Sequence, residues 1–263
     1  MKKLNFIIKY GLALLLLSFY SCESWLNVTP SDRLSEEMLF NDREGFVKAL
    51  NGVYIELNTN ELYGRNLTAG ALDVMGQYYS VASSSHAFYN YGGLVYTGND
   101  EKALFDNMWQ KCYAVIACCN TIIEKCDENK AGLSPVWKGS IKGEALALRA
   151  MLHFDMLRLF GPLTSELDKE SIPYQTNSDQ TVTPLLSGSE VIGLILDDLK
   201  NAVGLLKDTD PYFVEEEFSD TDLNYRRFRM NYFAAKGLMA RVQLWGGDKE
   251  KAAITAKEVI AEG

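Results

Sequence analysis

The chain has 263 residues, of which 47% are hydrophobic and 23% charged, an ordinary composition for a globular protein with a substantial core. Its formal net charge is −9, so its surface would repel the phosphates of a nucleic acid, which excludes that class of partner. The five cysteines include no CxxC pair and no histidine at zinc-site spacing, which argues against a structural metal site.

The first 21 residues are typical of a secretory signal peptide. They contain three lysines, no acidic residue, and an apolar run over 11–17 that is too short to span a bilayer as a permanent helix. Cys22 follows, as in a lipobox whose cysteine becomes the acylated N-terminus; the alternative is ordinary cleavage with Cys22 free. Several acyl chains, palmitate among them, would anchor the protein stably, since each buried methylene contributes about 0.8 kcal/mol.

The next predicted elements are one helix and one long irregular segment. Acidic residues at 36 and 37 lie where the helix dipole favours them, and apolar residues recur at helical spacing as far as Leu57. This pattern predicts a single helix over 35–57. From 58 to 100 the periodicity fades, which predicts a long loop insertion.

The irregular segment is rich in tyrosine. Residues 73–96 hold five of the chain's 14 tyrosines. A tyrosine offers a flat apolar face and a hydroxyl group, which together suit stacking on a sugar ring and hydrogen bonding to its rim. We therefore predict a ligand-binding loop, and the alternative is that these rings pack the loop onto the helices. The predicted site residues are Asp73, Tyr78, Tyr79, His86, Tyr89, Tyr91, Tyr96 and Asn99.

A helix is predicted over 101–128. Its inward stripe has one polar member and consists of Trp109, Tyr113, Ile116, Asn120 and Ile123. On a neighbouring face, three cysteines recur every seven positions, at 112, 119 and 126, which separates their sulfurs by roughly 10 Å. This distance is too long for a disulfide or a shared metal, so we interpret them as small core residues.

The segment 143–163, GEALALRAMLHFDMLRLFGPL, is predicted to form the longest helix. A glycine precedes it and Gly161-Pro162 ends it. Apolar side chains nearly encircle the segment, which is typical of a buried helix. Its polar exceptions lie on two lines, with Glu144, Asp155 and Arg158 on one and Arg149 and His153 on the other. We interpret them as partly buried pairs or clamps between helices, with a catalytic acid and base as the alternative.

The remaining segments alternate between loops and helices. A polar loop is predicted over 164–183, and Ser189 is predicted to cap a helix over 190–206. The acidic segment 208–222 is interpreted as solvated surface, with a calcium site as the alternative.

The last part of the chain is predicted to form a helical hairpin. Helices over 232–245 and 248–261 flank Gly246-Gly247, and alanines stand where the two helices would approach closely, at 234, 235, 240, 252 and 256. Tetratricopeptide repeats pair helices in the same way. The other helices pair similarly, so the fold predicted from the sequence is an all-α solenoid with one long loop insertion.

Several of these patterns resemble one protein family. The patterns are Gly143-Glu144-Ala145, Leu148-Arg149-Ala150, Phe154 and Arg158-Leu159-Phe160-Gly161-Pro162, the W-x3-Y-x2-I-x3-N-x2-I helix from Trp109, the I-x2-DL-x2-A run from Ile195, and the opening segment 24–30. They are similar to SusD/RagB-like proteins, the surface lipoproteins that Bacteroidetes use for nutrient uptake. Members of that family are built on tetratricopeptide-like repeats.

The resemblance implies a domain organisation and a location. Residues 1–21 would be a lipoprotein signal and 22–263 a SusD-like N-terminal helical domain, truncated relative to family members, which continue past the equivalent of Gly263. Glu23 beside Cys22 is similar to the acidic signal that takes such lipoproteins to the cell surface. The implied location is therefore the outer membrane, with a lipid anchor on Cys22 and the protein facing the exterior.

Two classes of function remain open. The resemblance implies a non-catalytic glycan-binding or nutrient-binding lipoprotein without a cofactor, which passes oligosaccharide to a TonB-dependent SusC-like outer-membrane barrel. The alternative is a tetratricopeptide-type protein-interaction scaffold that binds no sugar. An enzyme is disfavoured, because no opposed pair of carboxylates suggests a glycosidase and neither His86 nor His153 has a nucleophile motif around it.

Overall fold

The computed structural model describes residues 36–179 and 181–263. The predicted signal peptide 1–21, the predicted lipidation site Cys22 and the segment 24–30 lie outside these residues. The chain divides into two units, Met1–Leu39 and Phe40–Gly263. In the first, the described element is the short helix α2 (Glu36–Leu39), and every other described element belongs to the second unit.

The second unit is almost entirely helical. Its α-helices are α3 (Arg43–Leu57), α4 (Ala71–Met75), α5 (Tyr89–Gly92), α6 (Asn99–Glu128), α7 (Pro135–Phe160), α8 (Gly188–Thr209), α9 (Asp220–Arg226), α10 (Tyr232–Trp245) and α11 (Lys249–Glu262). A 3₁₀ turn, η2 (Glu215–Glu217), precedes α9, and β1 (Glu170–Pro173) pairs antiparallel with β2 (Leu185–Ser187). The hairpin aligns Glu170 with Ser187, and it was not predicted.

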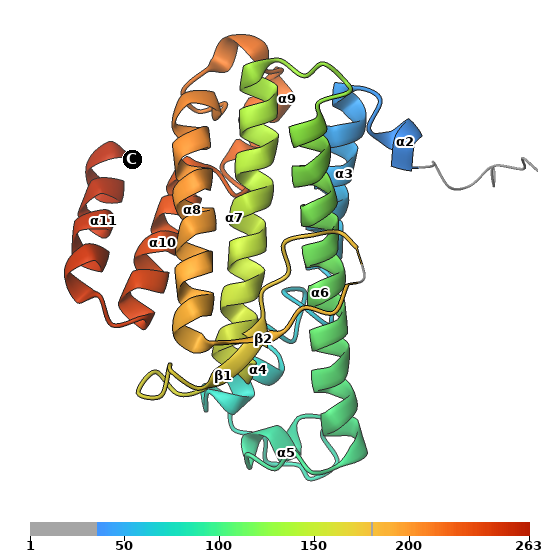
Figure 1. The fold of residues 1–263 in the computed structure, drawn as a ribbon. Coiled ribbons are helices and arrows are strands. Elements are labelled where there is room, and N and C mark those ends of the chain that lie inside the picture. The colour runs from blue at the N-terminus through green and yellow to red at the C-terminus, as the bar shows by residue number, and fades with distance from the viewer. Residues whose placement is uncertain (1–35, 180) are drawn as a thin grey trace, which may run out of the picture. The chain divides into compact units, whose positions relative to one another are not determined.

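The long helices stand side by side in chain order (Figure 1). Helix α3 contacts α6, α6 contacts α7, α7 contacts α8, α8 contacts α10, and α10 contacts α11. This succession confirms the predicted all-α, tetratricopeptide-like solenoid. The loop with α4 and α5 lies at one end of α6 and α7, and α9 lies at the other end (Figure 1). None of the helices in the described residues has the length and hydropathy needed to cross a bilayer.

The prediction of one helix over 35–57 is wrong, because the segment holds two helices, α2 and α3. Asp42 interrupts it with extended backbone angles and caps α3, since its carboxylate accepts a hydrogen bond from the Gly45 N–H at 2.8 Å. The N-cap preference of aspartate therefore decides the break, which the apolar periodicity does not reveal.

Helix α7 begins earlier than predicted, at Pro135 rather than at Gly143, and Ser134 caps it. Gly143 lies inside the helix, where a Cβ would come within 2.8 Å of Leu206 Cγ on α8. This glycine therefore permits close packing of two helices and does not mark a helix start. The predicted end before Gly161 is confirmed, but α7 with 26 residues is shorter than α6 with 30.

The prediction for the α6 cysteines is confirmed. Cys112, Cys119 and Cys126 are fully buried, and with the exposed Cys118 they are free thiols. Burial raises the pKa of the Cys119 thiol, as expected for a cysteine that acts as a small core residue. Of the predicted inward stripe, Ile116, Asn120 and Ile123 are buried, whereas Trp109 and Tyr113 are half-buried.

Three smaller predictions around α8 and the last hairpin need correction. The N-cap of α8 is Ser187 and not Ser189, because Ser187 forms a reciprocal capping box with Glu190. The acidic segment 208–222 is not solvated throughout, since Asp210 is fully buried. In the hairpin Ala235 and Ala252 are buried as predicted, but Ala234 is exposed.

Candidate functional site

The tyrosine-rich loop is anchored by a small aromatic core. Tyr91 is only 2% exposed and packs with Ala71 and Val74 from α4. Its ring contacts Phe88 edge-on at 5.8 Å and Phe105 of α6 at 6.0 Å between centroids. Tyr96 packs edge-on against Phe105 at 5.4 Å, and Phe105 touches Phe160 at the end of α7. Tyr91 and Tyr96 therefore pack the loop onto the helices, so for these two rings the alternative to ligand binding is supported.

Polar contacts hold the two halves of the loop together. The amide Nε2 of Gln77 donates to Val74 O at 3.3 Å and to Gly92 O at 3.0 Å, so the end of α4 lies against α5. Asn90 Nδ2 donates to Glu101 at 2.8 Å. Gln77 has a φ of 62° and Leu94 a φ of 54°. Left-handed backbone at such residues costs of order 1–3 kcal/mol and is concentrated at functional sites.

The other predicted tyrosines are exposed. The exposed fraction is 80% for Tyr78, 55% for Tyr79 and 42% for Tyr89. The Gln77 bond to Gly92 brings the segments that carry them together. Of the remaining predicted residues, His86 and Asn99 are exposed and Asp73 is half-buried on α4. The loop thus presents aromatic faces on an anchored backbone, and sugar binding there stays a prediction.

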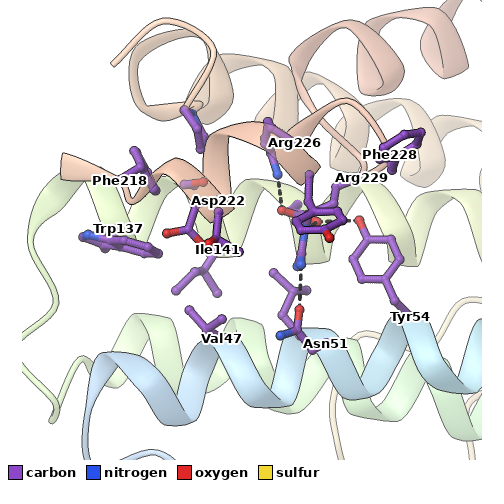
Figure 2. A pocket seen from close by; sticks show the side chains of 16 residues that line it. Val47, Asn51, Tyr54, Trp137, Ile141, Phe218, Asp222, Arg226, Phe228 and Arg229 are labelled. Carbon is purple, nitrogen blue, oxygen red and sulfur yellow. Dashed lines mark hydrogen bonds and ion pairs between the residues drawn. The ribbon is translucent and has the colours of Figure 1, made fainter. Parts of the chain in front are cut away.

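A pocket that the sequence analysis missed lies between α3, α7 and the segment 211–229 (Figure 2). Its volume is about 420 Å³, within the range of about 300–1,000 Å³ that is usual for ligand pockets. Aromatic and charged side chains line it together. The sequence signal that could have indicated it is the alternation of aromatic and cationic residues in Tyr225-Arg226-Arg227-Phe228-Arg229.

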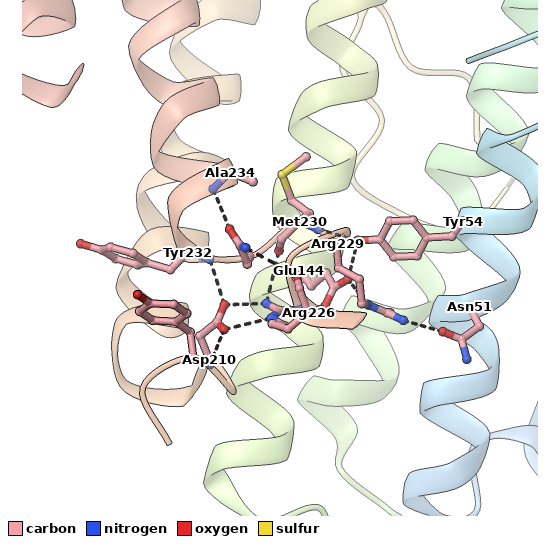
Figure 3. Close-up of polar contacts among 11 residues, drawn as sticks. Asn51, Tyr54, Glu144, Asp210, Arg226, Arg229, Met230, Tyr232 and Ala234 are labelled. Carbon is pink, nitrogen blue, oxygen red and sulfur yellow. Dashed lines mark hydrogen bonds and ion pairs between the residues drawn. The ribbon is translucent and has the colours of Figure 1, made fainter. Parts of the chain in front are cut away.

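A buried ionic network forms one wall of this pocket (Figure 3). Glu144 of α7, almost fully buried, accepts hydrogen bonds from Tyr54 of α3, from Arg226 and, at 2.8 Å, from Arg229 Nε. Asp210 accepts from Arg226 Nε at 2.9 Å and Nη2 at 2.6 Å. Glu144 thus acts as a clamp between helices, as predicted.

The network shifts the pKa of two of its members, Tyr54 and Arg226. Burial, and then the Glu144 carboxylate, raise the pKa of the Tyr54 hydroxyl well above its usual value. Burial lowers the pKa of Arg226, but the attraction of Glu144 and Asp210 outweighs it and leaves the net pKa raised. The raised pKa keeps the Arg226 guanidinium charged in the folded protein, so it can pair with both buried carboxylates.

A second buried network surrounds Arg149. Its guanidinium binds both carboxylate oxygens of Asp198 on α8 at 2.7 Å and Asn120 Oδ1 on α6 at 2.8 Å. His153 Nδ1 donates to Arg149 O at 3.0 Å, and its Nε2 accepts from the Gln175 N–H at 3.0 Å. These contacts confirm the clamp interpretation, because they connect three helices and the loop after β1.

The other predicted pair is also structural. Arg158 Nη1 donates to Asp155 at 2.9 Å, and the Tyr63 hydroxyl donates to the same carboxylate at 2.6 Å. Among the described residues, no group of three or more His, Cys, Asp or Glu side chains is arranged to hold a metal ion. Within 208–222, Asp210 is engaged by Arg226 at 2.6 Å, and calcium binding by that segment stays an untested alternative.

Comparison with known proteins places these features in a family context. Residues 24–244 match the sequence profile of a SusD-like family described as starch-binding and associating with the outer membrane. The chain is 26% identical over 265 aligned positions to SusD-like protein P2 of Formosa agariphila, covering 98% of this chain and 46% of that protein. It is 30% identical over 146 positions to a SusD-like protein of Bacteroides ovatus, covering 54% of this chain and 23% of that protein.

Solved structures share the fold. A SusD-like carbohydrate-binding protein from Bacteroides vulgatus matches with a TM-score of 0.67 and 23% identity, over 84% of this chain and 45% of that one. A laminarin-binding SusD-like protein matches with a TM-score of 0.61 and 17% identity, over 83% and 43% of the two chains. The chain spans about half the length, or less, of these relatives and structures.

Proposed function

This chain belongs to the SusD-like family of starch-binding proteins that associate with the outer membrane, and on that basis we propose that it binds a glycan through the exposed tyrosines of its 73–99 loop. The observation that carries the proposal is the contrast within one loop: Tyr91 is buried, whereas Tyr78, Tyr79 and Tyr89 present their rings to solvent. Exposing large aromatic side chains to water on an anchored loop costs free energy unless a ligand or partner covers them.

The proposed role is non-catalytic capture. In it, the protein is held in the outer membrane by acyl chains on Cys22, faces the exterior, and passes oligosaccharide to a TonB-dependent SusC-like barrel. The acidic charge of the chain and its signal-like N-terminus support an exported protein without nucleic-acid partners. No cofactor is part of this role.

The tyrosine site is tested by replacing Tyr78, Tyr79 and Tyr89 together with alanine. Each stacked ring is worth about 0.5–1.5 kcal/mol, so we expect binding to soluble starch or laminarin, measured by affinity electrophoresis, to weaken at least about tenfold. Tyr212→Ala is the matched control, because Tyr212 is also exposed but lies outside the loop. Unchanged binding with intact helical circular dichroism would refute this site.

The membrane anchor is tested separately, with Cys22→Ala. We expect this variant to move from the membrane fraction to the soluble fraction, because about 0.8 kcal/mol per buried methylene is lost. Cys118→Ala is the control, since Cys118 is an exposed thiol elsewhere in the chain. Retention of the Cys22 variant in the membrane would contradict lipid anchoring, and loss of a co-purifying barrel protein from the soluble variant would support the partnership.

The alternative role, a protein-interaction scaffold without sugar binding, has one observation in its favour. The last hairpin exposes large apolar side chains, namely Leu244, Ile254 and Ile260. Exposed apolar groups of this size commonly mark a polypeptide interface. Under this alternative, the tyrosine variant would retain its protein partners and the wild-type protein would bind neither polysaccharide.

A further inference from the structure

The pocket between α3, α7 and the segment 211–229 is separate from the tyrosine loop. The first half of α7, from Trp137 to Glu144, lines the pocket, whereas the loop packs near Phe160 at the other end of that helix. The helix axis between Glu144 and Phe160 is on the order of 24 Å long at 1.5 Å per residue. A ligand in this pocket would therefore not touch the exposed tyrosines of the loop.

Several polar groups that line the pocket are unused. Within the part of the chain that the structure describes, Asn51 Nδ2, Arg229 Nη2 and Asp222 Oδ1 have no hydrogen-bond partner, although their neighbouring atoms do. Ser140, only 4% exposed, lines the same pocket, and its hydroxyl also has no partner among the described residues. None of these atoms is a buried polar atom without a partner, which among the described residues applies to Ser171 Oγ. They are open to the pocket and are therefore available to a ligand or to water.

The apolar part of the lining is aromatic. Tyr225 is 61% exposed and Phe228 is 68% exposed, and both line the pocket. Phe218 lies at the opposite end, against Trp137 at 4.4 Å between centroids. Figure 2 shows Phe218 and Phe228 on either side of Asn51 and Arg229. Aromatic rings beside a few directed polar groups are suited to a ligand that is apolar on its faces and polar at its rim.

The charges around the pocket favour a neutral ligand. Arg226 is paired with Glu144 and Asp210, and Arg229 is paired with Glu144, so two cations are matched by two carboxylates. Asp222 adds a further negative charge, which would repel a phosphate or a carboxylate. The free donors on Asn51 and Arg229 require oxygen acceptors, and the positive charge of Arg229 disfavours an organic cation beside it.

We propose that this pocket is a second carbohydrate site, which takes one or two neutral sugar rings. Adjacent hydroxyl groups of a sugar both donate and accept, and so match an amide, a guanidinium edge and a carboxylate oxygen at once. The pocket is also preorganised, because Arg229 Nη1 is held by Asn51 Oδ1 at 2.6 Å and Arg229 Nε by Glu144. The site does not depend on the tyrosine loop.

The test uses ¹H–¹⁵N spectra of the protein during titration with neutral sugars. The probes are the methyl glycosides of glucose, galactose, mannose and xylose, with maltose and laminaribiose, each to about 20 mM, well above a millimolar Kd. The signal followed is the indole N–H of Trp137, a residue of the pocket wall. Glucuronate is the anionic comparison.

We expect a saturable shift with at least one neutral sugar and a clearly weaker response to glucuronate. Asn51→Ala should weaken binding about fivefold or more, because a donor to the ligand is lost. Asn201→Ala is the matched control, since Asn201 is also exposed on a helix but does not line the pocket. The shift should persist in the triple Tyr78, Tyr79, Tyr89 alanine variant, whatever that variant does to polysaccharide binding.

Three results would overturn the second site. These are no saturable shift with any of the neutral probes, a response to glucuronate as strong as to the neutral sugars, and equal binding by the Asn51 and Asn201 variants. Loss of the shift in the tyrosine variant would show that the two places are one site. Thermal melts of each variant establish that it is folded before the titration is interpreted.

Discussion

Replacing Arg226 by methionine is expected to lower the free energy of unfolding by about 3–5 kcal/mol. The guanidinium is the shared partner of Glu144 and Asp210, and both carboxylates are almost completely buried. Methionine fills a similar length but provides no donor, so Asp210 keeps only backbone N–H partners, such as Tyr232 N at 2.9 Å. Removing one partner from a buried ion pair leaves the other charge desolvated and unpaired. This destabilises the fold more than replacing both partners by apolar residues would.

The measurement is thermal or urea unfolding, in which the expected loss corresponds to a Tm lower by roughly 6–20 °C for a chain of this size. Arg227→Met is the matched control, because Arg227 is the next residue and is exposed, lying over the Phe228 ring at 4.8 Å. We expect that control to change stability by no more than about 0.5 kcal/mol. If Arg226→Met lost no more stability than Arg227→Met, the network would contribute nothing to the free energy of unfolding.

The second large effect is a loss of folding stability at low pH. His153 is fully buried, and burial, with a smaller contribution from the charge of Arg149, lowers its pKa from 6.5 to about 3. Its Nδ1–H donates to Arg149 O and its Nε2 accepts from the Gln175 N–H, so a second proton on Nε2 would face a donor. The neutral ring is therefore required in the folded state.

The direction of the pH effect follows from linkage. Between pH 6.5 and about 3 the unfolded chain binds a proton on His153 that the folded chain does not, so stability falls as the pH falls through this window. Between pH 7 and pH 4.5 the expected loss from this residue is about 2–3 kcal/mol. Above pH 6.5 the contribution is complete and does not change.

His153→Gln should be less stable than the wild type at pH 7, yet lose about 2–3 kcal/mol less on acidification. Urea unfolding at the two pH values measures both quantities. His86→Gln is the matched control, because it makes the same substitution at a histidine that is exposed on the tyrosine loop. The same acid sensitivity in the His153 variant and the wild type would show that other groups govern it.

The helices were largely predictable, because their signal is local. Apolar residues every three or four positions placed α6, α8, α10 and α11 within a few residues of their observed bounds. The exceptions are ends set by single capping residues. Asp42 divides the first helix, and Ser187 rather than Ser189 begins α8. Periodicity is blind to such residues, since a cap acts through one hydrogen bond and not through a repeating face.

The tyrosine loop was predictable as a cluster but not residue by residue. Five tyrosines in a short segment indicated a special loop, but the buried Tyr91 and the exposed Tyr78 look alike in sequence. The difference arises because Tyr91 meets Phe88 of its own loop and Phe105 from α6. Burial of a ring is decided by which side chains surround it, and those neighbours come from other elements.

The sequence by itself determined that this chain is acidic, helical and similar to SusD-like proteins, and that α7 carries its polar residues in pairs for contact with other helices. Only the tertiary structure decided what those residues contact. Glu144 meets Arg226 and Arg229, more than eighty positions away, and their meeting forms the wall of a pocket that no local pattern marked. The physical reason is that helical periodicity reports which face is buried, whereas ion pairing and cavities depend on the elements packed against that face.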